Sequence, residues 1–152
     1  DINLHGPALL PNDYCGDVHL RLSFYKKLAT AKTTEQIDRL MEEIADRFGK
    51  LPPQAIALVD VHRLRVLCAP YGIVKVDAAP TVINISFNKD APIDPGKIIE
   101  LIQKHRYIKL AGNDKLRIEK AFEDPNVRVH MVRDVLRHLG KPQVSAEAIA
   151  TP

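Results

Sequence analysis

The chain lacks tryptophan and has only four phenylalanines and four tyrosines, so aromatic residues make up 5% of it. With a hydrophobic content of 45%, the core must be built mainly from aliphatic side chains. There are two cysteines, Cys15 and Cys68, and neither stands in a CxxC or Cys/His ligand spacing. This pattern predicts two reduced, buried thiols in a cytosolic protein, and it gives no support for a disulfide framework or a zinc site.

Signals for membranes and export are also missing. We find no signal peptide and no apolar run long enough to cross a bilayer, so the sequence predicts a cytoplasmic protein without a membrane partner. The chain begins at Asp1 without a methionine, which suggests a segment of a longer polypeptide or a processed chain. Its 152 residues predict one domain over residues 1–140 and a disordered tail over 141–152.

Motifs of enzymes are absent as well. The sequence has no GxxxxGK[ST], GxGxxG, HExxH or GxSxG. The six histidines are scattered, and His130 and His138 lie too far apart on one helix to share a metal ion. Glu42 and Glu43 are adjacent, so they splay apart on a helix and do not form a carboxylate pair for acid–base chemistry. We therefore expect no enzymatic activity, cofactor or metal in this chain.

Hydrophobic periodicity predicts an α+β fold. Extended structure over residues 1–20 precedes three helices, at 17–32, 33–48 and 53–69. The remainder is predicted as ββαββα, with strand pairs in 72–87 and around Gly112-Asn113 and helices at 94–105 and 124–139. An N-terminal strand and three-helix segment followed by ββαββα is typical of an antiparallel or mixed sheet.

The predicted 33–48 helix has the clearest signals. Thr33 and Gln36 form a T-x-x-Q capping box, and Gly49 predicts a left-handed αL residue at the end. An apolar stripe at helical spacing includes Ile37, Leu40, Met41, Ile44 and Phe48. In the 53–69 helix, apolar residues surround most of the circumference, so we expect it to be the central, most buried helix.

Acidic residues stand where a helix disfavours them. Glu42, Glu43 and Asp46 lie in the last two turns of the 33–48 helix, near the negative end of its dipole, at a cost of about 0.3–1 kcal/mol each. Steps of about 100° per residue point all three to solvent. One interpretation is a solvated face, stabilised by Arg39–Glu43 and Glu43–Arg47 pairs. The other is a docking face for a basic partner.

Basic residues are concentrated later in the chain. The overall net charge is +3, but residues 97–141 contain eleven basic and six acidic side chains. A solvated surface of mixed sign explains this region, since no aromatic stacking platform and no cluster of arginines and lysines is visible in the sequence. The alternative is a nucleic-acid-binding module that uses the basic 97–141 region.

Four stretches follow one another in the spacing of a known family: "ALLPNDY" (8–14), "RLSFYKKLATAKT" (21–33), "DRFGKLP" (46–52) and "LRVLCAPYGIVKV" (64–76). Together they make the chain, from about residue 2 to 140, similar to the C-terminal domain of bacterial transcription-repair coupling factors (Mfd). Members of this family are large ATP-dependent DNA translocases that release RNA polymerase stalled at DNA damage and recruit UvrA for nucleotide excision repair. The resemblance places their ATP, magnesium and duplex DNA sites in motor domains outside this chain.

The resemblance implies a regulatory role. In the family, the C-terminal domain packs in cis on an N-terminal UvrB-like module, which masks the UvrA-binding surface and restrains the translocase until a stalled polymerase is engaged. Acidic residues on the helix before the "RFG" turn meet basic residues of that module. Glu43 and Asp46 match those positions, and Glu42 is included as their neighbour. Arg47, Phe48 and Gly49 are expected to be structural.

Overall fold

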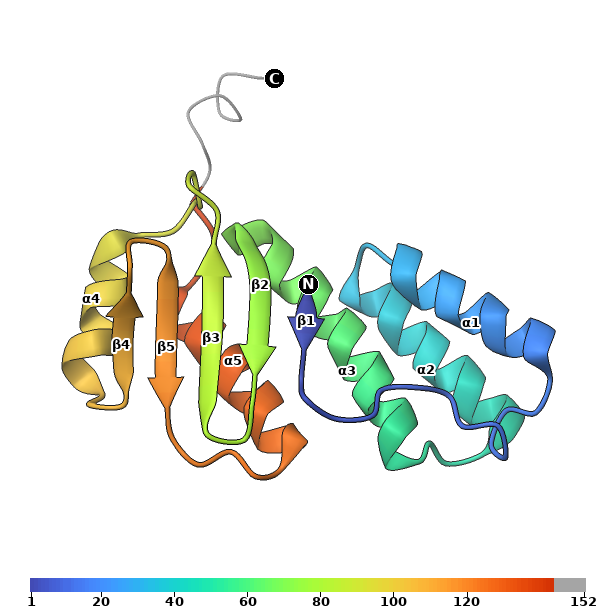
Figure 1. Cartoon of the computed structure of the whole chain (residues 1–152). Helices are drawn as coiled ribbons and strands as arrows, with labels where there is room; N and C mark the ends of the chain where they lie inside the picture. Colours follow the sequence, from blue (N-terminus) through green and yellow to red (C-terminus); the bar gives the residue numbers. More distant parts are fainter. Residues whose placement is uncertain (144–152) are drawn as a thin grey trace, which may run out of the picture.

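The computed structural model describes residues 1–143, and the predicted order of elements is confirmed (Figure 1). Strand β1 (Ile2–Asn3) precedes helices α1 (Val18–Thr30), α2 (Thr34–Phe48) and α3 (Pro53–Cys68), and a 3-10 turn η1 (Ala69–Tyr71) follows α3. The second part contains β2 (Ile73–Ala78), β3 (Val82–Phe87), α4 (Pro95–Lys104), β4 (Ile108–Ala111), β5 (Lys115–Glu119) and α5 (Pro125–Leu139). Residues 144–152 of the predicted tail lie outside the described residues.

The five strands form one mixed sheet in the order β1-β2-β3-β5-β4. Strand β1 pairs with β2 in parallel, and every other pair is antiparallel. The N-terminal segment therefore contributes only two residues to the sheet, at its edge, although extended structure was predicted up to residue 20. Pro7 and Pro11 lack a backbone N–H, so they could not continue a hydrogen-bonded strand there.

The hydrophobic residues form two core clusters. One lies between the sheet, α4 and α5, and the other lies among α1, α2 and the N-terminal half of α3. Helix α3 contributes to both, with Leu58 and Val59 in the helical cluster and Leu64 and Cys68 in the sheet cluster. No residue from 54 to 68 is exposed, so the prediction that this helix is central is confirmed.

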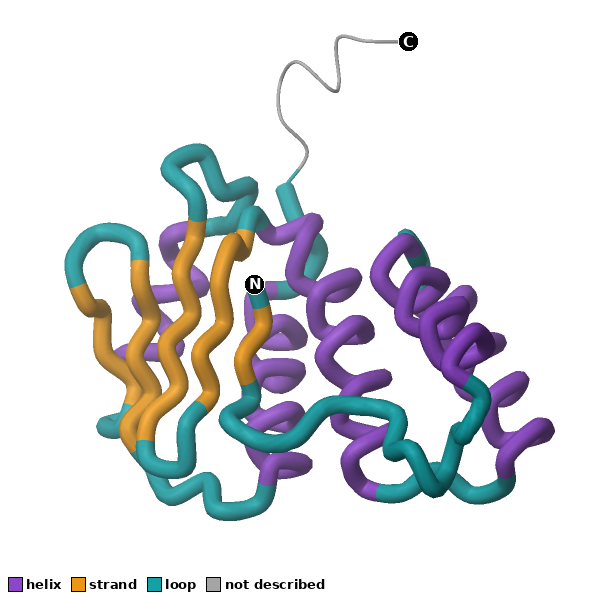
Figure 2. Tube along the Cα trace, turned by 45° about the vertical axis from the view of Figure 1, so that its right-hand side comes forward, coloured by secondary structure: helices purple, strands orange, loops and turns teal. Residues whose placement is uncertain are grey.

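Helices cover only one face of the sheet (Figure 1). The inward side chains come from alternate positions such as Val76, Ile85 and Leu116, which are fully buried against α3, α4 and α5. Figure 2 shows that the opposite face carries no helix or strand of the described chain. We call this surface the open face; its strand residues are Asn3, Lys75, Asp77, Val82, Asn84, Ser86, Lys109, Ala111, Lys115, Arg117 and Glu119.

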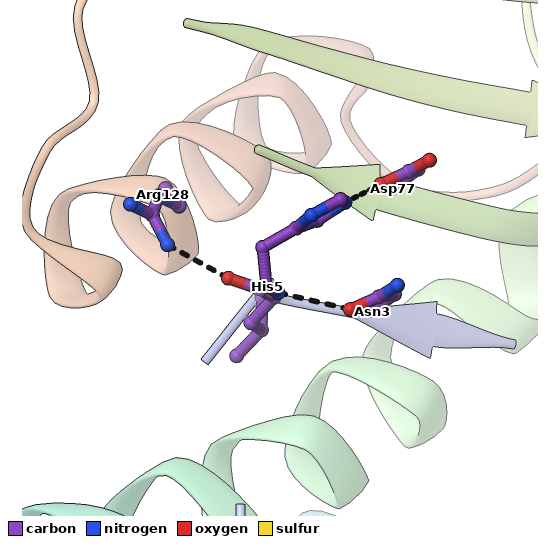
Figure 3. Close-up of polar contacts among 5 residues, drawn as sticks. Asn3, His5, Asp77 and Arg128 are labelled. Atoms are coloured by element: carbon purple, nitrogen blue, oxygen red, sulfur yellow. Dashed lines mark hydrogen bonds and ion pairs between the residues drawn. The ribbon is translucent and has the colours of Figure 1, made fainter. Parts of the chain in front are cut away.

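A buried arginine ties the N-terminal segment to α5 (Figure 3). The Arg128 side chain is only 3% exposed and donates hydrogen bonds to the carbonyl oxygens of Phe122 (2.6 Å), Leu4 (2.8 Å) and Glu123 (3.0 Å). Next to Leu4, His5 has a positive φ of 54° and its ring pairs with Asp77 of β2. These contacts fix the point where the N-terminal segment leaves the sheet and crosses to the helices.

Candidate functional site

The helix that carries the acidic residues is anchored on both neighbouring helices. Its Ile37 and Ile44 are fully buried in the helical cluster. Arg63 of α3 pairs with Asp38 of α2. Arg65 of α3 donates to the carbonyls of Leu28 and Ala31 at the end of α1, at 2.9 and 3.0 Å. Helix α2 is thus held in a three-helix unit, which gives its outer surface a fixed shape.

The start of α2 follows the predicted capping box only in part. The Thr33 hydroxyl accepts a hydrogen bond from the Gln36 N–H at 3.1 Å, as predicted. The Gln36 side chain, however, accepts from the N–H of Lys32 at 2.7 Å instead of that of Thr33. Because the connection from α1 spans only residues 31–33, the Lys32 N–H lies within reach and the long glutamine side chain satisfies it.

The end of α2 is fixed by aromatic packing and by a glycine. The Phe48 ring lies 5.7 Å from that of Tyr14 and 6.1 Å from that of Phe24. Gly49 donates its N–H to the Ala45 carbonyl at 2.8 Å and accepts from the Tyr14 hydroxyl at 2.6 Å. Its φ of 90° is positive as predicted, but a ψ of −168° is not that of an αL residue. After Gly49 the chain continues to Pro52, the N-cap of α3, which begins at Pro53.

A Gly49→Ala variant tests whether the end of α2 requires this backbone conformation. With φ and ψ in a region that only glycine adopts readily, Gly49→Ala should destabilise the domain by about 1–3 kcal/mol. A methyl group there would meet no atom within 4 Å, so the loss would come from backbone strain alone. Thermal unfolding followed by circular dichroism measures it, with Gly16→Ala, at a glycine without positive φ, as the matched control. If the midpoint of thermal unfolding is unchanged in Gly49→Ala, the conclusion that this backbone conformation requires glycine is wrong.

The three acidic residues of α2 point away from the core, as predicted. Glu42 and Asp46 are exposed. Glu43 is half-buried, with 39% of its side chain exposed. Glu42 and Asp46 lie on the side of the helix opposite Ile37 and Ile44, which are fully buried, and Glu43 lies at the flank next to α1. The acidic surface, defined by these three carboxylates, is accessible to a partner.

Only one of the two predicted stabilising ion pairs forms. Glu43 lies 3.9 Å from Arg47, as expected. The prediction of an Arg39–Glu43 pair is wrong, since no such pair forms among the described residues. Instead, the Nζ atom of Lys27 in α1 lies 4.0 Å from Glu43. Helix α1 packs alongside α2 and brings Lys27 across the gap between them. The sequence could not indicate this contact, because it depends on how the two helices pack.

The carboxylates of the acidic surface therefore differ in charge compensation. Glu43 has two cationic neighbours, whereas Glu42 and Asp46 form no ion pair within residues 1–143. Glu42 and Asp46 are four residues apart, so they lie on one ridge of the helix. Their charges are uncompensated close to the negative end of the α2 dipole. This placement is unfavourable for the helix taken alone.

Two cysteines and the carboxylate of Asp60 are buried or half-buried in the described part of the chain. Cys15 and Cys68 are free and buried, and burial raises the pKa of the Cys68 thiol to about 12. Asp60 lines a cavity of about 380 Å³ between α3 and α5, where burial raises its pKa. No nucleophile pairs with it. Among residues 1–143, no three potential ligand side chains are grouped to bind a metal ion.

The basic 97–141 region is divided by the fold. Arg128 is buried, while Lys109, Lys115 and Arg117 lie on the open face. Arg133 and Arg137 line an open cavity of about 390 Å³ on the other side, beside Tyr71 of η1. The basic residues therefore do not form one surface. No helix within the described residues has the length and apolar character needed to cross a membrane.

Comparisons with known proteins agree with this architecture. A family model described as "TRCF domain" matches residues 4–98. The chain is 42% identical over 138 residues to the transcription-repair-coupling factor of Haemophilus influenzae, a match that covers 90% of the chain and 12% of the relative. The corresponding protein of Escherichia coli is 35% identical over 140 residues, or 91% of the chain and 12% of the relative. The chain thus spans about an eighth of these relatives.

A solved structure has the same fold. The crystal structure of the C-terminal domain of transcription-repair coupling factor superposes with a TM-score of 0.72 at 19% sequence identity. The match covers 91% of this chain and 92% of the other. The strand, the three helices and the ββαββα segment are therefore found together in a known domain.

Proposed function

The chain belongs to the TRCF domain family of transcription-repair coupling factors, and from this premise we propose that it is a regulatory, autoinhibitory interaction domain of such a factor. It packs in cis on the N-terminal UvrB-like module of the same polypeptide. In this position it masks the UvrA-binding surface and restrains the DNA translocase. Engagement of a stalled RNA polymerase releases the contact, and the exposed module then recruits nucleotide excision repair.

The proposed role is non-enzymatic. The domain needs no cofactor, whereas ATP, Mg²⁺ and duplex DNA bind to motor domains elsewhere in the bacterial, cytoplasmic parent. UvrA and RNA polymerase are partners of the domain only indirectly, through the parent. The contact in cis is the function assigned to residues 1–140.

One observation carries the proposal: the acidic surface of α2 presents two uncompensated carboxylates, Glu42 and Asp46, on a rigid helix. Asp46, together with Glu43, matches acidic positions that the family resemblance assigns to the contact. A cationic partner surface would offset the unfavourable position of these charges at the end of the helix. Exposed ion pairs determine association rate and specificity more than affinity, which suits a contact that must open.

Calorimetry on the domain and the separately produced N-terminal module of the same parent tests the proposal. We expect one-to-one binding whose affinity falls as salt rises, because dissolved ions screen exposed charges. The Debye length is about 10 Å at 0.1 M salt and becomes shorter as salt is added. Binding of equal strength at 50 and 300 mM salt would contradict an electrostatic contact through α2. Absence of binding even when the module is joined to the domain by a flexible linker would contradict the proposed function itself.

The structure also predicts a variant that strengthens the contact. Lys27 lies 4.0 Å from Glu43 and competes with a partner's cation for that carboxylate. Lys27→Gln should therefore tighten binding to the module about 2–5-fold, the range expected for one exposed pair. Lys26→Gln is the matched control, since Lys26 lies one position along α1 and is not paired with Glu43 among the described residues. Equal effects of the two changes in calorimetry would contradict a specific role of Lys27.

A further inference from the structure

The open face brings together cations that the sequence keeps apart. Lys75 comes from β2, Lys109 from β4, and Lys115 and Arg117 from β5, so three strands contribute to one surface. All four side chains are exposed. Figure 1 shows this surface toward the viewer, with α4 and α5 behind the sheet. It lies on a different part of the domain from α2.

The two carboxylates of the open face are already paired within the chain. Glu119 lies 2.8 Å from Arg117 and 3.3 Å from Lys109, and Asp77 pairs with His5. Lys75 and Lys115 form no ion pair among residues 1–143. Four cations against two anions leave the surface with a net charge of about +2, concentrated at the two unpaired lysines.

Those two lysines flank a hydroxyl. Ser86 of β3 is in register with Lys75 on one side and with Lys115 on the other. Neighbouring strands lie about 4.8 Å apart, which separates the two lysine backbones by about 10 Å. Asn84 follows on β3 at the next position of the same face, between Asp77 and Arg117. The Ser86 residue is itself only 9% exposed, so the accessible donors are the lysine ammonium groups and the half-buried Asn84 amide. Ammonium and amide donors are among the groups that contact phosphate oxygens in protein–DNA complexes.

The composition of the surface distinguishes between classes of partner. A stable protein interface has an apolar centre enriched in aromatic residues and methionine and depleted of charge. The two central rows of the open face contain no aromatic residue and no methionine, because their residues are lysine, arginine, aspartate, asparagine, serine and one alanine, Ala111. The larger apolar residue Val82 lies outside these rows, opposite Glu119. Binding to a polyanion requires no apolar area, since release of condensed counterions drives it.

We propose that the open face is a second interaction surface, which contacts the phosphate backbone of duplex nucleic acid through Lys75, Lys115, Lys109 and Arg117. The central rows carry no aromatic platform for unstacked bases, so the contact is independent of sequence and favours a duplex over a single strand. This surface is independent of the acidic surface of α2.

Fluorescence anisotropy with a labelled 25-base-pair duplex tests the proposal on the full chain. If four phosphates are neutralised, the logarithm of the binding constant should fall with the logarithm of salt with a slope of about −3 to −4. Lys75→Glu/Lys115→Glu should weaken binding at least about 10-fold at 50 mM salt and reduce the slope by about 2.

Lys26→Glu/Lys104→Glu is the matched control, with the same change in net charge at two exposed lysines on α1 and α4. It should change the affinity less than about threefold. The proposal is overturned if wild type shows no binding at 25 mM salt, or if the control weakens binding as much as the open-face variant. It is also overturned if a 20-residue poly-L-glutamate displaces the duplex at equal charge, because an acidic protein would then be the better partner.

Discussion

Arg128→Met is expected to destabilise the domain by about 2–4 kcal/mol, a large fraction of the stability of a domain of this size. The change removes three hydrogen bonds and leaves the carbonyls of Leu4, Phe122 and Glu123 without their charged donor. Each unsatisfied buried acceptor costs about 1–3 kcal/mol. Part of this cost is offset, because a methionine does not require the burial of a positive charge.

The position of Arg128 explains why the effect should be large. Its guanidinium joins α5 and the loop just before it to the N-terminal segment, and Arg128 and Leu4 are 124 residues apart in the chain. Figure 3 shows the bond to the N-terminal segment. Strand β1 pairs with β2 over only two residues, so the bond to Leu4 is a main attachment of that segment to the sheet half. We therefore expect Arg128→Met to increase hydrogen exchange at residues 2–5 beyond the global change.

Denaturant unfolding followed by circular dichroism measures the loss. Arg137→Met is the matched control on the same helix, because the Arg137 side chain is 70% exposed and should change stability by about 0.5 kcal/mol or less. Arg128→Lys should not rescue the loss, since a single ammonium cannot span three carbonyls. A stability for Arg128→Met within 0.5 kcal/mol of wild type would contradict the structural role described here.

Sequence patterns predicted the elements well because their signals are local. Asp17, Thr33, Asp94 and Asp124 each begin a helix by accepting hydrogen bonds from backbone N–H groups of the first turn. Strand pairs were visible as β-branched runs around short turns. Arg128 gave no such signal. In the sequence it is one of many basic residues in the 97–141 region, and its burial depends on three carbonyls that the fold brings together.

The features of the candidate sites also differ in whether the sequence alone could predict them. The orientation of Glu42, Glu43 and Asp46 follows from helical periodicity within one segment, so it could be predicted. The Lys27–Glu43 pair depends on the packing of α1 against α2. The open face depends on sheet order, because β5 lies between β3 and β4 and its register places Lys115 opposite Ser86. No periodicity within one strand contains that information.

The second large effect concerns the acidic surface. Glu43→Lys/Asp46→Lys should leave the domain folded and weaken its binding to the N-terminal module about 10- to 100-fold. Each exposed ion pair contributes up to about 1 kcal/mol, and reversal replaces the attraction with a repulsion of similar size. Calorimetry at 50 mM salt measures the loss, which should shrink at 300 mM as the charges are screened.

The matched control is Asp90→Lys/Glu123→Lys, which changes net charge equally at two exposed positions outside α2. It should leave binding within about threefold of wild type.

The single variants sharpen the test. Glu43 already has Lys27 and Arg47 beside it, whereas Asp46 has no ion pair among the described residues, so Asp46→Lys should cost more affinity than Glu43→Lys. If the double variant binds as wild type does, the contact lies elsewhere. If the control is equally weak, net charge and not the acidic surface drives association.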